Sequence, residues 1–204
     1  MLLLLAAALV GLSAGWLRAR IQHRPYTTVT LRHPWLVFLA FLPQWLAFGL
    51  QVTREHISTP WASAALISSQ ILLLIFVWFN RSHPAFWLLG LGLLLNFFVI
   101  VLNGGLMPIS PETVHQLYPT ALASEWQIGS RLGTGKDIVL TVEQTRLWFL
   151  SDRFLTPPAL NYQAAFSLGD VLIALGACWL LYAPGKNPER EGEVSWLLVS
   201  RKAN

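Results

Sequence analysis

Long apolar runs separated by short polar segments dominate the pattern along this chain. About five runs approach the roughly 20 helical residues needed to cross ~30 Å of hydrocarbon. They cover residues 2–17, 35–52, 61–79, 85–102 and 164–182. Because unpaired backbone groups are costly in lipid, each run is expected to be helical. The pattern predicts an all-α fold, a polytopic membrane helix bundle with about five transmembrane helices in a membrane domain of residues 1–182.

The longest polar segment, residues 103–163, separates the fourth and fifth runs. The sequence Asn103-Gly104-Gly105 predicts a turn at its start. Ser110-Pro111-Glu112 predicts the N-cap and first turn of a short helix that stops by Pro119. This segment is expected to be extracytoplasmic and to pack over the end of the helix bundle.

A second, amphipathic helix is predicted over residues 142–155 of the same segment. Thr141 and Gln144 have the spacing of a capping box, and the apolar residues that follow share one helical face. Residues 121–140 predict a loop or a small hairpin. The polar residues 183–204 are expected to form a cytoplasmic tail.

Composition supports the membrane interpretation, because 54% of the residues are hydrophobic and only 12% are charged. The formal net charge of +4 does not indicate nucleic-acid binding, since the basic residues form no tract. Most basic residues instead lie in the short segments after the first and third runs and in the tail, whereas the short segment after the second run holds only Arg54. The positive-inside rule therefore predicts that the N-terminus lies outside and the C-terminus inside.

Small residues recur at four-residue spacing in the first run, at Ala7, Gly11 and Gly15. Such a stripe lets another helix approach closely, so it predicts a packing face. The partner could be another helix of this chain, a second copy or another membrane protein. The lone Cys178 excludes an intrachain disulfide.

Asp170 is the one acidic residue within an apolar run, and an ionisable group at membrane depth suggests function. Ser167 and Asp170 also have capping-box spacing, so Asp170 could serve as a helix cap alone. Asn103 ends the fourth run on the side where Asp170 begins the fifth, and Asp152 lies in the segment between them. The sequence therefore predicts a ligand-binding cluster of Asn103, Asp152 and Asp170.

Three stretches carry a resemblance to a known family. They are NFFVIVLNGGLMPIS at residues 96–110, TRLWFLSDRFLTPP at 145–158 and SLGDVLIALG at 167–176. Together they resemble an uncharacterised family of small bacterial multi-spanning membrane proteins, catalogued as a domain of unknown function. Ser151 stands where the family pattern has glycine. The resemblance implies a multi-pass protein of the bacterial cytoplasmic (inner) membrane and supplies no activity.

Three classes of function are compatible with these features. No complete catalytic constellation or cofactor motif is found, which favours a non-enzymatic accessory protein or a small-ligand or lipid-binding protein in the bilayer. The alternatives are a protein that translocates an ion or solute, and an enzyme acting on a lipid-linked substrate at the outer face. No cofactor is predicted, and the pattern identifies no metal.

Overall fold

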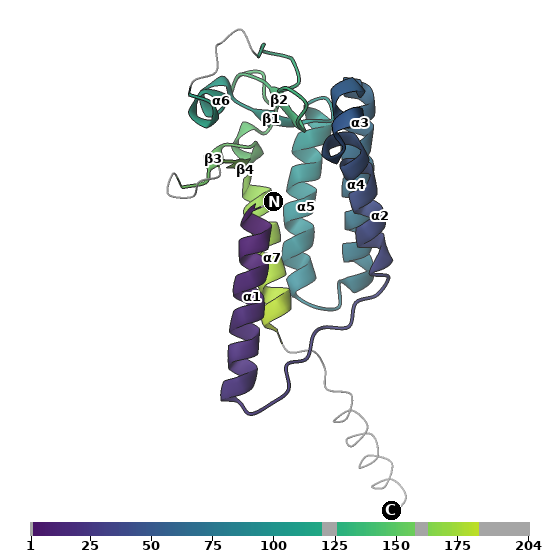
Figure 1. Cartoon of the computed structure of the whole chain (residues 1–204), viewed down its shortest axis with the longest axis vertical. Coiled ribbons are helices and arrows are strands. Elements are labelled where there is room, and N and C mark those ends of the chain that lie inside the picture. The colour runs from purple at the N-terminus through teal and green to yellow at the C-terminus, as the bar shows by residue number, and fades with distance from the viewer. Residues whose placement is uncertain (1, 120–125, 158–162, 184–204) are drawn as a thin grey trace, which may run out of the picture.

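The computed structural model describes residues 2–119, 126–157 and 163–183. Its helical elements fall into a bundle of long segments and a smaller layer at one end (Figure 1). The bundle elements are α1 (Leu2–Ile21), α2 (Trp35–Gln44), the π-helix η1 (Trp45–Gly49), α3 (Gln51–His56), α4 (Thr59–Asn80), α5 (Ala85–Leu102) and α7 (Leu168–Tyr182). The predicted tail, residues 183–204, lies almost wholly outside the described residues.

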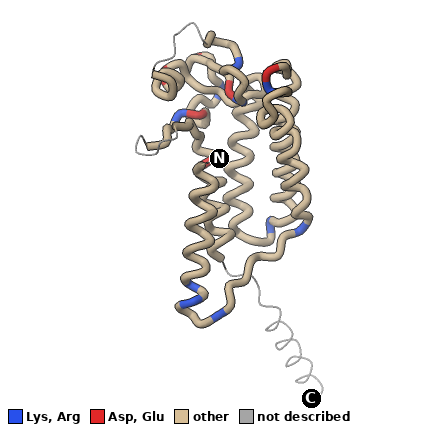
Figure 2. Tube along the Cα trace, in the orientation of Figure 1, with Lys and Arg blue, Asp and Glu red and all other residues tan. Residues whose placement is uncertain are grey.

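The expected helical bundle is confirmed in its main features. Helices α1, α4 and α5 are long and apolar enough, by length and composition, to cross a membrane. The continuous segment α2–η1 and helix α7 are shorter apolar helices. Figure 2 shows the charged residues near the two ends of the bundle, with an uncharged stretch of helix between them.

Helix α7 packs closely against both α1 and α5 because glycines leave room for its backbone. A Cβ atom added to Gly11 of α1 would lie 2.5 Å from the Cys178 carbonyl oxygen, and one added to Gly15 would lie 2.7 Å from that of Leu181. On the opposite side, a Cβ on Gly92 of α5 would lie 2.5 Å from the Gly169 carbonyl oxygen. Gly11 and Gly15 of the predicted stripe therefore lie on a helix-packing face, and their partner is α7.

Helix α4 joins this group to α2. Gln44 of α2 donates a hydrogen bond to Ser69 of α4, 2.6 Å long. Phe86 of α5 is fully buried and packs edge-on against Phe76 of α4. The hydrogen bond between Gln44 and Ser69 satisfies a side-chain amide that would otherwise lie unpaired in apolar surroundings.

The second apolar run is not the single helix predicted over residues 35–52. Pro43 lies inside α2, the backbone then widens into η1, and Leu50 is extended before α3 begins. Proline lacks the N–H that an interior helical position would donate, and a π-turn is a known way to accommodate such a fault. The run is therefore broken near one end of the bundle.

A smaller layer, which we call the cap layer (residues 103–119, 126–157 and 163–167), covers that end of the bundle. Strand β1 (Met107–Ile109) pairs in parallel with β2 (Asp137–Val139), and β3 (Phe154–Leu155) pairs antiparallel with β4 (Ala165–Phe166). The layer also holds helix α6 (Pro111–Leu117) and the 3-10 turn η3 (Trp148–Leu150).

Two local predictions for the cap layer are confirmed. Gly104 and Gly105 both have positive φ angles, 85° and 86°, as the predicted turn requires. Helix α6 begins at the predicted N-cap, where the Ser110 hydroxyl accepts a hydrogen bond from the Thr113 amide.

The predicted helix over residues 142–155 is wrong. Thr141 closes a single turn with Thr145, and Leu147 then takes a left-handed backbone conformation with φ of 56°. The amide of Asp152 bonds instead to the Pro108 carbonyl, which places this segment beside β1. Tertiary hydrogen bonds thus replace the intrahelical ones that the local pattern predicted.

We expect Gly11→Leu to destabilise the protein, since the new side chain would meet the backbone of α7. Overpacking of this kind costs about 1–3 kcal/mol. Thermal unfolding of the purified protein, followed by tryptophan fluorescence, measures the loss. Val10→Leu, at an exposed neighbouring position, serves as the control, and equal melting of the two variants would contradict the packing role.

Candidate functional site

The start of α7 is fixed by a reciprocal cap. The Ser167 hydroxyl accepts a hydrogen bond from the Asp170 amide at 3.0 Å, and the Asp170 carboxylate accepts one from the Ser167 amide at 3.1 Å. The capping role predicted for Asp170 is therefore confirmed. Capping uses Oδ2 of Asp170 and leaves Oδ1 for another partner.

That partner is Asn96, in the middle of α5. Its amide nitrogen donates to Asp170 Oδ1 at 2.9 Å, and its amide oxygen accepts from the Ser167 hydroxyl at 2.8 Å. Ser167 is fully buried and Asn96 is 5% exposed. Asn96 was recognisable in the sequence as a polar residue within an apolar run, but nothing local linked it to Asp170.

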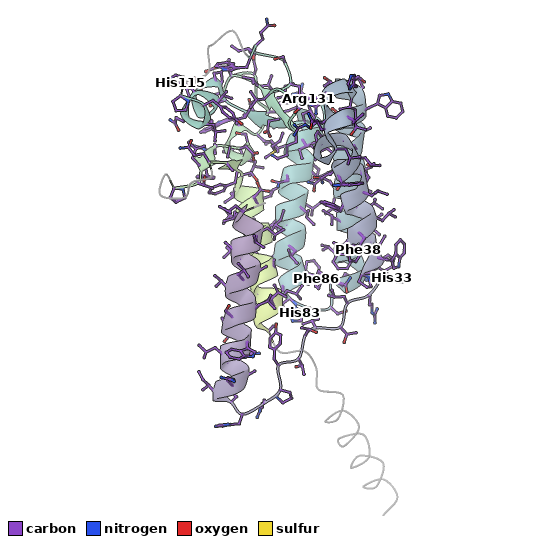
Figure 3. All side chains as sticks on the ribbon, viewed as in Figure 1. His33, Phe38, His83, Phe86, His115 and Arg131 are labelled. Atoms are coloured by element: carbon purple, nitrogen blue, oxygen red, sulfur yellow. The ribbon has the colours of Figure 1, made fainter. Side chains whose placement is uncertain are left out.

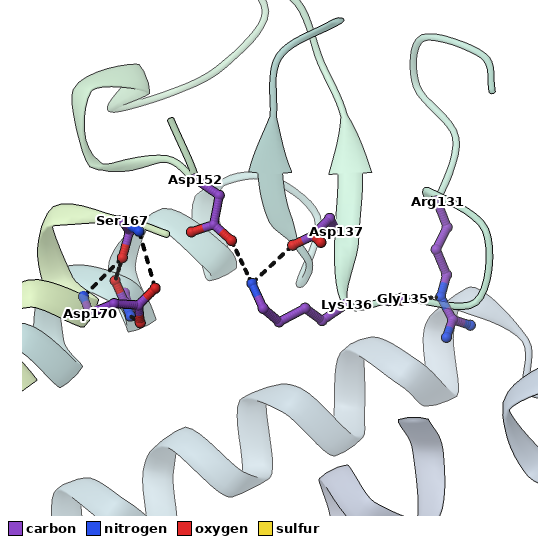
Figure 4. A network of polar contacts seen from close by, with 8 residues as sticks. Arg131, Gly135, Lys136, Asp137, Asp152, Ser167 and Asp170 are labelled. Carbon is purple, nitrogen blue, oxygen red and sulfur yellow. Dashed lines mark hydrogen bonds and ion pairs between the residues drawn. The ribbon is translucent and has the colours of Figure 1, made fainter. Parts of the chain in front are cut away.

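A second polar group surrounds Lys136 in the cap layer. The ammonium group donates to Asp152 Oδ2 at 2.6 Å and to Asp137 Oδ1 at 2.9 Å. Figure 4 shows the Asp152 carboxylate between this ammonium and the Ser167–Asp170 turn. Sequence reasoning missed Lys136, because it lies in a glycine-rich loop and its partner Asp152 is 16 residues further along the chain.

Lys136 and its two carboxylate partners differ in how far their side chains are exposed to solvent. The Asp152 side chain is 2% exposed, that of Asp137 is 22% exposed, and that of Lys136 is 43% exposed. Burial lowers the pKa of the Lys136 ammonium, but the charges of Asp137, Asp152 and Asp170 together outweigh it and raise this pKa above the ordinary value. Lys136 is therefore positively charged throughout the physiological pH range.

Asp152 is in a different situation. Burial raises the pKa of its carboxyl to about 7, against the opposing effect of Lys136, and the charges of Asp137 and Asp170 raise it further. Its second oxygen, Oδ1, is buried and has no hydrogen-bond partner among the described residues. A buried acceptor without a donor is costly, and it marks a place where a donor could bind.

Asn103, the third predicted site residue, lies in a different contact. Its amide group bonds to both the amide and the carbonyl of Arg146, at 2.9 Å each, and to the Val99 carbonyl at 2.7 Å. Asn103 thus connects the cap layer to the end of α5 through these hydrogen bonds. Of the predicted cluster, Asp152 and Asp170 lie in one electrostatic environment, while Asn103 has a separate structural role.

The histidines give no metal site among the residues that the structure describes. Figure 3 shows His33 and His83 at the end of the bundle opposite His115. The ring of His33 packs on Phe79 with centroids 4.7 Å apart, and His83 accepts a hydrogen bond from the Ala85 amide at 3.3 Å.

A large apolar groove lies between the broken second run and α4. Its volume is about 910 Å³, within the range of about 300–1,000 Å³ typical of small-molecule pockets. The groove is lined by Pro43, Leu46, Ala47, Val52, Thr53, His56, Ile57, Trp61, Ala64, Ala65 and Ser68. Apart from Thr53, His56 and Ser68, these residues are apolar, so the groove suits a hydrocarbon.

The groove follows from the break in the second run. Beyond η1 the chain turns at the extended residue Leu50, whose carbonyl accepts a hydrogen bond from the Arg54 amide, and the Thr53 hydroxyl donates to the Leu46 carbonyl. The side chains that line the groove thus come from α2, η1, α3 and α4. Broken helices in membrane proteins commonly mark binding sites.

Comparison with known proteins identifies relatives but no activity. A family model described as a family of unknown function, DUF5317, matches residues 28–182. An uncharacterised protein of Thermotoga maritima is 36% identical over 58 residues, which cover 28% of this chain and 34% of that protein. No solved structure matches the chain.

The network at the start of α7 predicts a compensating pair of substitutions. Asp170→Asn retains one acceptor oxygen, so its amide nitrogen must face either the Asn96 amide group or the Ser167 N–H, and Asn96→Asp places two carboxylates side by side. Each should lower the unfolding free energy by about 1–2 kcal/mol. The double variant restores a donor opposite an acceptor. Its loss of unfolding free energy should therefore be smaller than the sum of the two single losses. Additive losses in thermal unfolding would contradict a direct contact.

Proposed function

This chain belongs to a family of unknown function, DUF5317, so we propose its function from the shape and chemistry of the fold: an integral membrane protein that holds a lipid hydrocarbon chain in the groove beside α4. The proposal is non-enzymatic. The single observation that carries it is the groove itself, formed where the second apolar run breaks.

The surface of the bundle supports residence in a bilayer. Large apolar side chains are exposed along α1, α2, α4 and α5, among them Val10, Phe38, Trp61, Trp87 and Phe98. Such a continuous apolar surface would be unfavourable in water and is expected of helices that face lipid. The five apolar helical segments of the bundle are then its membrane-crossing elements, with α2–η1 counted as one.

Charge supports one orientation. The end of the bundle opposite the cap layer carries five arginines and no described acidic residue (Figure 2). They are Arg18, Arg20, Arg24, Arg32 and Arg81. By the positive-inside rule this end faces the cytoplasm of a bacterium, and the cap layer lies outside.

The occupant of the groove follows from its position. An open apolar groove between lipid-facing helices is filled most readily by the chains of the surrounding lipid, because a dry void forfeits van der Waals contacts. Thr53 and His56 lie where the groove approaches the cap layer, so a lipid headgroup would meet polar side chains there. This arrangement fits a lipid of the outer leaflet.

The orientation predicts accessibility to a membrane-impermeant maleimide in a Cys178→Ala background. Thr134→Cys, in the cap layer, should react in intact cells. Ser82→Cys, between α4 and α5, should react only after permeabilisation. Both positions are exposed in the structure, so neither is hidden by the fold. The reverse pattern would contradict the orientation, and extraction of the protein by alkali without detergent would contradict residence in the bilayer.

The groove predicts selective labelling by a phospholipid with a photoreactive acyl chain. In nanodiscs, crosslinks located by mass spectrometry should concentrate within residues 43–68. Ala64→Trp, which fills the groove, should reduce these crosslinks several-fold. Ala6→Trp adds the same side chain to the exposed surface of α1 and serves as the control. Labelling spread evenly over all helices, or equal effects of the two variants, would contradict the proposal.

A further inference from the structure

The junction between the cap layer and α7 holds more negative than positive charge. Asp137, Asp152 and Asp170 all act on one another or on Lys136 through their charges. Lys136 is the only cation among the described residues in this electrostatic group. The guanidinium of Arg153, adjacent in sequence to Asp152, lies instead over the Trp148 ring at 4.5 Å. With all three carboxylates ionised, the group would carry a net charge of −2.

Two of the three carboxylates are compensated in ways that the structure shows. Asp170 accepts hydrogen bonds from Asn96 and from the Ser167 amide. Asp137 pairs with Lys136 and keeps contact with solvent, since its side chain is 22% exposed. Neither has a buried oxygen that lacks a partner among the residues described.

Asp152 differs from both. Oδ2 accepts from Lys136, but Oδ1 is buried without a donor and lies on the side that faces the Ser167–Asp170 turn (Figure 4). Among the described residues, the charged groups that act on Asp152 are Lys136, Asp137 and Asp170, so Lys136 is the only cation in the group. The excess negative charge is therefore least compensated at this oxygen.

We propose that Asp152 is a proton-binding site, with the proton held on Oδ1 between the cap layer and the start of α7. A proton turns this unsatisfied acceptor into a donor on the side of the Ser167–Asp170 turn, and it removes one negative charge beside Asp170. Lys136 keeps its contact with Asp137, 2.9 Å away. The direction in which the pKa of Asp152 is displaced, upward to about 7, agrees with this assignment.

Proton release should loosen the junction. Asp152 is tied to β1 through its backbone amide, which bonds to the Pro108 carbonyl, so its side chain and the cap layer move together. An ionised Asp152 leaves a buried, partly compensated charge next to a second carboxylate. Because the pKa in the folded protein lies above the ordinary value of 3.8, the stabilising contribution is complete below that value and is lost as pH rises through about 7.

The test compares thermal unfolding of the full chain at pH 5 and pH 8 for three proteins. The wild type should melt several degrees lower at pH 8. Asp152→Asn mimics the protonated form, since its amide can accept from Lys136 and donate at the Oδ1 position. This variant should lose the difference between the two pH values and melt above the wild type at pH 8. Asp137→Asn, the matched control on the same lysine, should keep a pH-dependent decrease.

An ordinary ion pair would give a different result. If Lys136 keeps Asp152 ionised, the pKa of this carboxyl lies below 3.8, so the wild type should melt at about the same temperature at pH 5 and pH 8, and Asp152→Asn should melt below it at both. That result would overturn the proposal, and so would a melting temperature that Na⁺ raises at pH 8 while pH itself has no effect. If Asp152→Asn does not fold, the proposal is refuted, because the amide would then be unable to replace the protonated carboxyl. These measurements do not depend on the groove, so they stand whether or not a lipid binds there.

Discussion

Close backbone contact on both sides of α7 is the constraint on which the rest of this structure depends. Glycines of α1 and α5 admit the α7 backbone to distances that any side chain would prevent. Three helices thereby form a unit without a disulfide, since the one cysteine is free. Association of helices in lipid gains little from the hydrophobic effect, so packing and interhelical hydrogen bonds must supply the stability. The fixed position of α7 then determines where its polar N-terminus meets the other elements.

The polar groups at that end form a continuous arrangement from the bundle to the cap layer. Asn96 joins α5 to the cap of α7, and Asp152 brings the cap layer to the same place. Leu106, Met107 and Leu150 pack in one buried cluster with Leu66 and Val99 of the bundle. This apolar cluster thus holds the cap layer in position. The charged groups around Lys136 are the ones that we propose make the junction sensitive to pH.

The two proposed sites lie in parts of the molecule with different packing. Beside α7, close glycine contacts and capping hydrogen bonds restrict the movement of the helices. Beside α4, the second apolar run is interrupted by Pro43, a π-turn and the extended residue Leu50, and the space between the helices is apolar and open. A rigid junction suits a site that binds a proton, whereas an open groove suits a ligand that enters from the bilayer.

The sequence by itself determined the features that depend on neighbouring residues. The apolar runs, the Gly104-Gly105 turn, the Ser110 cap and the Ser167–Asp170 capping box follow from hydropathy, backbone conformation and hydrogen bonds within a few residues. Only the tertiary structure decided that Gly11 packs on α7, that Asn96 bonds to Asp170, and that Lys136 pairs with Asp152. It also replaced the helix predicted over residues 142–155, because Asn103 and Pro108 bond to its backbone. Such contacts join residues far apart in the chain. Their energies depend on which surfaces meet in the folded protein, and a local sequence pattern does not contain that information.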